Sequence, residues 1–132
     1  MTKVILLYNA IQCPDGTIIE SKHRHDFVQH KQLDGRDYFV DGGLDYQRIG
    51  YSDNEFINLL VTTEDDHAKI REVFEWTSNY DANMNPIAPV KRKLKDLTDD
   101  HVKALVIWTE EGYPEYVHKI MLDEAEYRNL EV

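Results

Sequence analysis

The hydrophobic pattern of this chain changes its period once, at Thr62, and that change constrains the fold more than any other feature. Before Thr62, short apolar runs such as Lys3–Ile11 and Tyr38–Val40 are separated by turn residues, which is typical of β-strands. After it, apolar residues recur about every 3.6 residues, as on the buried face of an α-helix. Strands joined by short turns are antiparallel. We therefore predict an α+β fold in which an N-terminal antiparallel β-sheet (mainly 1–61) is packed by about three C-terminal helices (mainly 62–132).

Turn signals indicate where the expected strands begin and end. Pro14-Asp15-Gly16 and Asp34-Gly35 favour tight bends, and Asp41-Gly42-Gly43 interrupts the apolar run before it. The extended segment that begins at Thr17 is expected to continue through His23 to Lys31. Two further strands are expected, at Tyr46–Tyr51 and Phe56–Val61.

Three helices are expected in the second half. The first has Thr63 as its predicted N-cap and the second has Thr98, because a threonine hydroxyl accepts a hydrogen bond from the first turn. The third begins after Pro114, a residue that suits a first turn. Between the first two helices we expect a loop over Asn79–Pro89 and a strand over Val90–Leu97. The inner stripe of the last helix is predicted to contain Val117, Ile120, Met121 and Glu124.

Length and composition limit the class of protein. A chain of 132 residues is expected to form a single domain, 1–132. No apolar run approaches the roughly 18 residues that a membrane-spanning helix needs. The one cysteine, Cys13, cannot form an intrachain disulfide, which favours a reducing cytoplasm as the location.

The chain is strongly acidic. It has 15 Lys and Arg residues against 25 Asp and Glu residues, for a net charge of −10. Such a surface repels phosphate backbones, so we expect no binding to duplex nucleic acid. It is compatible with a basic protein partner. It is also compatible with a small anionic ligand, because a buried pocket is governed by its own few charges.

The densest polar cluster is His23-Arg24-His25-Asp26. Alternate side chains of a strand share a face, so one face would carry His23, His25 and Phe27, and the other Arg24 and Asp26. Two histidines on one face can reach one metal ion, but no HExxH or CxxC motif supplies further ligands. Three interpretations stay open: a solvated edge strand, a metal site, and a binding site around Arg24.

Nucleophilic catalysis has little support in the sequence. Cys13 has no identifiable partner base, and Ser21 lies near His23 but outside any GxSxG motif. Gly42-Gly43 is not followed by the GK[ST] of a phosphate loop. We therefore predict a binding protein with no catalytic residue, no cofactor and no resident metal.

Two features of the second half favour ligand binding. Arg128 lies four residues after Glu124 on the inner stripe of the last helix, so it pairs either with Glu124 or with an anionic ligand. The segment Trp76–Lys95 combines aromatic, amide and basic side chains. Trp76 could stack on a base while basic groups bind phosphate. The alternative is a polar loop followed by a solvated basic strand.

Six short segments stand out along the chain. In the first half they are Cys13-Pro14-Asp15-Gly16-Thr17, Ser21-Lys22-His23-Arg24-His25-Asp26-Phe27 and Asp41-Gly42-Gly43-Leu44-Asp45-Tyr46. In the second half they are Glu72–Trp76, Leu94–His101 and Glu126–Arg128. Together these segments resemble a group of small phage-encoded proteins, which implies action in the cytoplasm of a host cell.

The layout and size are also similar to those of the Thoeris anti-defence sponges of phages. Those are small oligomeric proteins with an N-terminal antiparallel sheet and C-terminal helices. The resemblance implies a homo-oligomer that sequesters a nucleotide-derived signal without cleaving it. Arg24 in the sheet and Arg128 near the C-terminus carry the resemblance.

The leading hypothesis is a phage accessory protein that binds a small anionic nucleotide-derived ligand and does no chemistry. One alternative is an acidic inhibitor or modulator that binds a host protein. Another is a metal-dependent hydrolase that uses His23, His25 and Asp26. The predicted ligand-binding residues are Arg24, His23, His25, Asp26, Phe27, Trp76 and Arg128.

Overall fold

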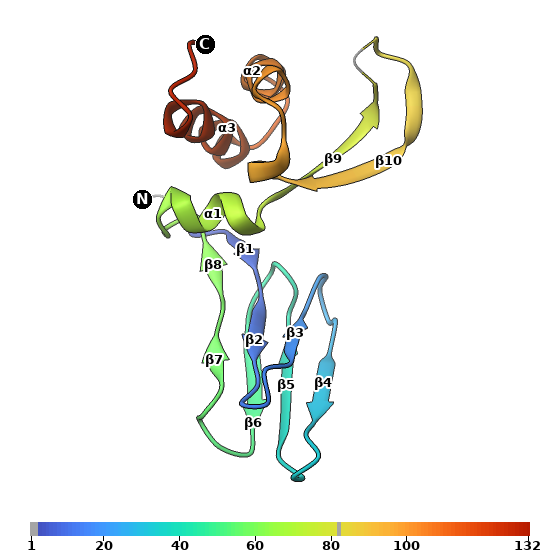
Figure 1. Ribbon diagram of the computed structural model, residues 1–132, viewed down its shortest axis with the longest axis vertical. Coiled ribbons are helices and arrows are strands. Elements are labelled where there is room, and N and C mark those ends of the chain that lie inside the picture. Colours follow the sequence, from blue (N-terminus) through green and yellow to red (C-terminus); the bar gives the residue numbers. More distant parts are fainter. Residues whose placement is uncertain (1–2, 82) are drawn as a thin grey trace. The chain divides into compact units, whose positions relative to one another are not determined.

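The computed structural model describes residues 3–81 and 83–132 (Figure 1). The predicted α+β class is confirmed, because antiparallel strands fill the first half and the described α-helices lie in the second. The chain divides into two compact units, Met1–Asp65 and Asp66–Val132. The division lies close to Thr62, where the hydrophobic period changes. That the whole chain is a single domain stays a prediction.

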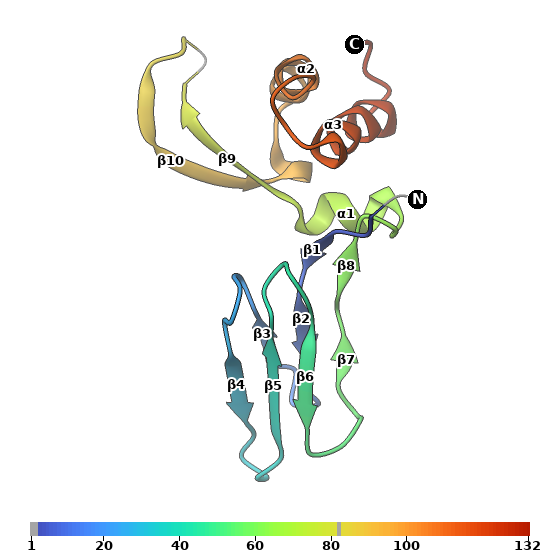
Figure 2. The ribbon, with the colours of Figure 1, turned by 180° about the vertical axis from the view of Figure 1, so that it is seen from behind.

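The first unit contains three small antiparallel sheets, seen from both sides in Figures 1 and 2. Their strand orders are β3-β2-β7, β4-β5-β6 and β1-β8. The strands are β1 (Leu6–Tyr8), β2 (Ala10–Gln12), β3 (Ile18–Glu20), β4 (Val28–Lys31), β5 (Asp37–Asp41), β6 (Arg48–Tyr51), β7 (Ile57–Asn58) and β8 (Val61–Thr62).

Successive side chains of β5 point alternately into the core of the first unit and to the opposite face of the sheet. Tyr38 and Val40 are buried in the core, while Phe39 between them points to the other side of the sheet. Cys13 is part of the same core, and burial raises the pKa of its thiol. The core cluster consists of Ile11, Cys13, Ile19, Tyr38 and Val40.

The second unit combines helices with a two-stranded antiparallel hairpin. Its elements are α1 (His67–Val73), β9 (Glu75–Tyr80), β10 (Pro86–Lys93), the 3₁₀ turn η1 (Leu94–Asp96), α2 (Asp99–Trp108) and α3 (Glu115–Tyr127). Among the described residues, no helix is long and apolar enough to cross a membrane.

The expected loop over Asn79–Pro89 is too long, because its two ends, residues 79–80 and 86–89, belong to the strands of the hairpin. β9 extends to Tyr80, and β10 begins at Pro86, which pairs with Tyr80. The prolines favoured a loop because proline cannot donate to a ladder. A strand at a sheet edge tolerates proline, however, and β10 is such a strand. The strand expected over Val90–Leu97 also ends early, at Lys93.

Capping explains where the helices begin. The Thr98 hydroxyl accepts a hydrogen bond from the N–H of His101 at 3.2 Å, which confirms the predicted cap of α2. The prediction for Thr63 is wrong, because α1 begins at His67 and the Thr63 hydroxyl instead accepts from the N–H of Ile5. The predicted stripe of α3 is confirmed as buried: Val117, Ile120, Met121 and Glu124.

Candidate binding site

The His23–Asp26 segment forms a tight turn between β3 and β4, so the prediction of a strand through His23 to Lys31 is wrong. The N–H of Asp26 donates to the carbonyl of His23 at 3.0 Å, and His25 has a φ of 65°. A left-handed residue at His25 is incompatible with an extended strand. The predicted alternation, with His23 and His25 on one strand face, is therefore absent.

The side chain of Ser21 joins this turn to the Asp41–Gly43 segment. The Ser21 hydroxyl donates to the carbonyl of Asp26 at 2.6 Å and accepts from the N–H of Gly43 at 2.8 Å. Gly43 has a φ of 56°, and a Cβ there would lie 2.2 Å from the carbonyl carbon of His23. Only glycine fits this close approach, so the His23–Asp26 turn and the Asp41–Gly43 segment form one packed structural unit.

Asn9 holds the other side of the same segment. Its side chain is fully buried, and Nδ2 donates to the carbonyl oxygens of Asp41, Gly43 and Tyr46 at 3.2, 2.9 and 3.0 Å. One buried amide therefore fixes the path of the chain from Asp41 to Tyr46. Asn9 is a structural residue that sequence reasoning missed, because its hydrogen-bond partners are more than thirty positions away in the chain.

The predicted ligand-binding side chains of the first unit lie in or beside this turn. The side chain of Arg24 is 70% exposed, and its Nε lies 3.7 Å from Asp45. His25 Nδ1 lies 3.4 Å from the Tyr46 hydroxyl. Phe27 is half exposed and stacks on Phe39 with ring centroids 4.6 Å apart. The turn therefore offers Arg24 and one face of Phe27 to solvent.

Arg128 is engaged within the second unit. Its guanidinium donates to the carboxylates of Glu124 and Asp99 and to the carbonyls of Leu97 and Leu94, at distances of 2.6 to 2.9 Å. The side chain is only 12% exposed. These bonds join α3 to η1 and to the start of α2. A ligand role for Arg128 stays a prediction, and a ligand would have to compete with these partners.

Glu124 is the buried centre of this network. His67 Nε2 lies 2.8 Å from one carboxylate oxygen, and Arg71 donates to both oxygens. Burial raises the pKa of Glu124, but hydrogen bonds from Arg71, Arg128 and His67 outweigh burial, so the pKa is lowered overall. The pairing of Glu124 with Arg128 was one sequence alternative. Arg71 and His67 were missed, because α1 approaches α3 only in the folded unit.

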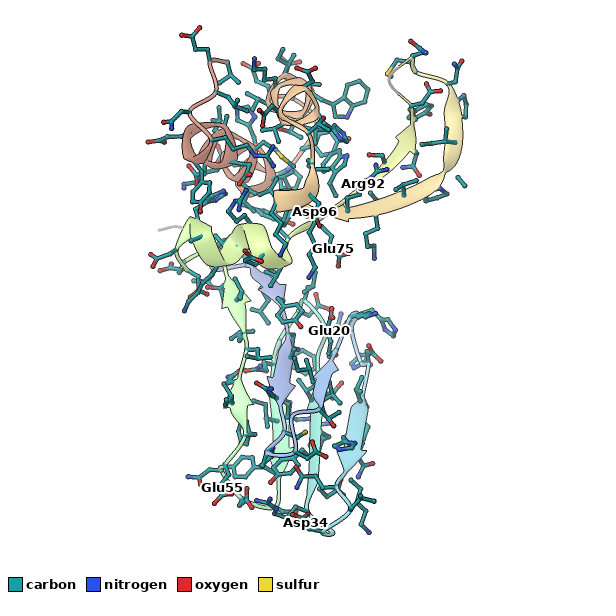
Figure 3. The ribbon with its side chains drawn as sticks, in the orientation of Figure 1. Glu20, Asp34, Glu55, Glu75, Arg92 and Asp96 are labelled. Atoms are coloured by element: carbon teal, nitrogen blue, oxygen red, sulfur yellow. The ribbon has the colours of Figure 1, made fainter. Side chains whose placement is uncertain are left out.

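The second unit has a hollow of about 770 Å³ between the β9–β10 hairpin and α2. Figure 3 labels Arg92 and Asp96 near the base of the hairpin, and both line this hollow. β9 and the residue after it contribute the unbroken run Trp76–Asp81. The opposite wall contains Thr98, Asp100, His101, Ala104, Leu105 and Trp108. We call this hollow the hairpin groove; Trp76 is the predicted site residue that lines it.

Aromatic side chains dominate the walls of the hairpin groove. Trp108 Nε1 donates to the Tyr113 hydroxyl at 2.8 Å, and the rings of Trp76 and Tyr113 lie 5.8 Å apart. Trp108 and Tyr80 are both 52% exposed. Trp108 and Tyr113 were missed from the sequence. Trp108 lies outside the apolar stripe of α2, and a tryptophan outside the buried stripe of a helix is the signal that could have identified it.

The hairpin groove carries net negative charge. Asp81, Asp96 and Asp100 line it against one arginine, Arg92. Burial and the neighbouring Arg92 both lower the pKa of His101, so its imidazole is neutral at pH 7. The backbone N–H groups of Asn85 and Asn83 donate to the Asp81 carboxylate and lower its pKa, so this carboxylate stays ionised. The groove therefore favours neutral or cationic groups over anions.

Metal-ligating side chains are dispersed. Among residues 3–81 and 83–132, no three His, Cys, Asp or Glu side chains are grouped so that they could hold a metal ion.

Residues 5–51 match a domain of unknown function, DUF7695. The match covers the His23–Asp26 turn and the Asp41–Tyr46 segment, and it ends before the second unit begins. No curated protein and no solved structure matches the chain. The hairpin groove therefore lies outside the matched region.

Proposed function

We propose that the protein binds a basic segment of a partner protein in the hairpin groove and acts as an acidic modulator of that partner. The observation that carries this proposal is a hollow whose walls combine solvent-exposed aromatic rings with three carboxylates and a single arginine. Exposed aromatic side chains gathered in a hollow are typical of interaction sites. Carboxylates around them select cationic partners by charge, and the exposed ring faces can add cation–π contacts.

Net charge supports the same partner class. The second unit has nine Lys and Arg residues against fourteen Asp and Glu residues. Opposite charge speeds encounter between proteins and loses its effect as salt rises. We therefore expect binding to a basic segment to weaken strongly with ionic strength.

A small nucleotide-derived ligand, held without cleavage, is the second candidate. Its support is the cluster of Trp76, Trp108 and Tyr113, which offers ring faces to a base, and Arg92, which could bind one phosphate. The three aspartates of the groove disfavour further phosphates. A homo-oligomer and a location in the host cytoplasm stay predictions.

Isothermal titration of the full chain with defined probes tests the proposal. The probes are a peptide of about eight residues in which lysine or arginine alternates with valine, the same peptide with glutamate in place of the basic residues, adenosine monophosphate and cyclic ADP-ribose. We expect the basic peptide to bind, with at least about tenfold loss of affinity between about 0.05 M and about 0.5 M salt. Preferential binding of the glutamate peptide or of a nucleotide would overturn the proposal.

A pair of neighbouring variants locates the site. Trp108→Ala removes a groove wall, whereas Ile107→Ala changes a side chain that is 75% exposed and does not line the groove. Trp108→Ala should lower the affinity for the basic peptide by about tenfold or more, as expected when a tryptophan anchor is lost. Ile107→Ala should leave affinity within about twofold. Equal effects of both variants would place the binding site elsewhere.

A further inference from the structure

We infer that the partner segment binds as an extended strand added to the free edge of β9, which extends the hairpin into a three-stranded sheet. This inference rests on the proposed function and specifies how the hairpin groove engages its partner. Strand addition supplies affinity through main-chain hydrogen bonds and specificity through alternate side chains.

The way β9 lines the groove is the first observation. The lining residues from β9 and its end are consecutive, from Trp76 to Asp81. Successive side chains of a strand point to opposite faces, so one face of a strand could contribute only every second residue. The consecutive run shows that residues from both faces of β9, and therefore its backbone, border the hollow, and Ile87 and Arg92 of β10 line it as well. Away from the base of the hairpin, both ribbon views show β9 on the side of α2 and β10 on the outer side (Figures 1 and 2).

The edge of β9 is open to a further strand. Within the described residues, β9 pairs only with β10. β9 has no proline among its residues Glu75–Tyr80, so its outward amides can donate. β10 is different, because it contains Pro86 and Pro89, which lack an N–H and cannot donate to a further strand. Of the two edges of the hairpin, only that of β9 offers an unbroken ladder.

Exposure of the hairpin is a third observation. Its strands are exposed throughout, apart from the half-buried Trp76, Ser78 and Val90. A two-stranded hairpin in water is marginally stable by itself. A third strand in the groove would cover these residues and satisfy the outward amides and carbonyls of β9.

The walls specify the side chains of the added strand. On the α2 side, Ala104, Leu105 and Trp108 offer an apolar surface. Asp100 lies on the same wall, and Asp96 lines the groove near the base of the hairpin. A segment that alternates apolar with basic residues would place apolar groups on the first set and cations near the second. The geometry therefore favours a basic, alternating, extended segment over a helix or a folded surface.

Two N-methylated versions of the basic peptide test this inference. One version carries N-methyl groups on its odd-numbered residues and the other on its even-numbered residues. In a β-ladder alternate amides point toward the neighbouring strand, so one version should lose about tenfold or more in affinity and the other less than about threefold. Equal loss, or no loss, in both versions would overturn strand addition while leaving the groove as a binding site.

Amide hydrogen exchange of the full chain, followed by NMR, supplies the second readout. In the free protein, the β9 amides that do not face β10 should exchange fast, and the basic peptide should slow them. Peptide binding that leaves these amides unprotected would overturn the inference but not the proposed function. No binding of any peptide would overturn both. Protection of these amides in the free protein, together with a dimeric mass, would assign the edge to a second copy and also overturn the inference.

Discussion

Glu124 and Arg71 form a two-point ion pair inside the second unit, with Nε of Arg71 3.0 Å from Oε1 and Nη2 2.9 Å from Oε2. The guanidinium also lies over the ring of Tyr127, 4.4 Å from its centroid. These contacts join α1 to α3 through a carboxylate that has no exposure to solvent. Because a buried charge needs its partners, the packing of these helices depends on electrostatics as well as on apolar contact.

Replacement of this carboxylate should destabilise the protein severely. Glu124→Gln keeps the shape of the side chain but leaves Arg71 and Arg128 without their buried counter-charge. We expect a loss of about 3 to 5 kcal/mol in the free energy of unfolding, measured by urea denaturation. Glu126→Gln, on the exposed side of α3, is the matched control and should change stability by less than about 0.5 kcal/mol. Similar stabilities of the two variants would contradict the structural role of Glu124.

Acid should remove the contribution of the ionised Glu124 carboxylate to the free energy of unfolding. Its pKa is lower in the folded protein than the ordinary value of 4.5, because hydrogen bonds from cations outweigh burial. The stability from its ionised form is therefore complete above pH 4.5 and is lost as the pH falls through the lower folded pKa. Urea unfolding at a series of pH values should show this loss in the natural chain. Glu124→Gln should show a shallower dependence, and an equally steep one would count against the assignment.

Two glycines with positive φ should differ in their tolerance of alanine. Gly43→Ala would place a Cβ 2.2 Å from the backbone of His23, whereas at Gly16 nothing lies within 4 Å. Gly16→Ala should cost only the strain of a left-handed residue, about 1 to 2 kcal/mol. Gly43→Ala carries that strain and must also displace the His23–Asp26 turn, so it should cost clearly more by thermal or urea unfolding. An equal cost at both positions would mean that the turn does not pack on Gly43.

The groove histidine offers a local test of its electrostatics. Burial and Arg92 lower the pKa of His101 below the ordinary value of 6.5. Arg92→Gln should raise that pKa toward 6.5, as measured by NMR titration of the imidazole. Lys91 pairs with Thr77 and points to the opposite face of β10 from Arg92, so Lys91→Gln is the control. A larger change with Lys91→Gln would show that the groove is not arranged as described.

The fold class could be predicted because it depends on interactions between residues that are close in the sequence. The Thr98 cap and the stripe through Met121 depend on near neighbours and were predicted correctly. The change of period at Thr62 predicted the α+β class, although the strands β9 and β10 also follow it. The hairpin was missed because its prolines and asparagines carry loop signals, and edge position in a sheet overrides those signals only after folding.

The candidate site was less accessible to prediction. The aromatic interpretation of Trp76 placed one residue in the hairpin groove, but Trp108 and Tyr113 come from α2 and the segment that follows it. The His23–Asp26 cluster was interpreted as a strand, whereas the left-handed His25 and the close approach to Gly43 make it a turn. Such long-range contacts leave no periodic signal in the chain.

The two tryptophan indoles provide the most direct test of the central claim, that the hairpin groove is the binding site. The chain contains two tryptophans, Trp76 and Trp108, and both line the groove. In a two-dimensional NMR titration of the ¹⁵N-labelled full chain with the basic peptide, we predict that both indole N–H signals move while the backbone signals of His23 and His25 stay in place. Binding that moves the signals of the His23–Asp26 turn and leaves both indoles unchanged would contradict the account.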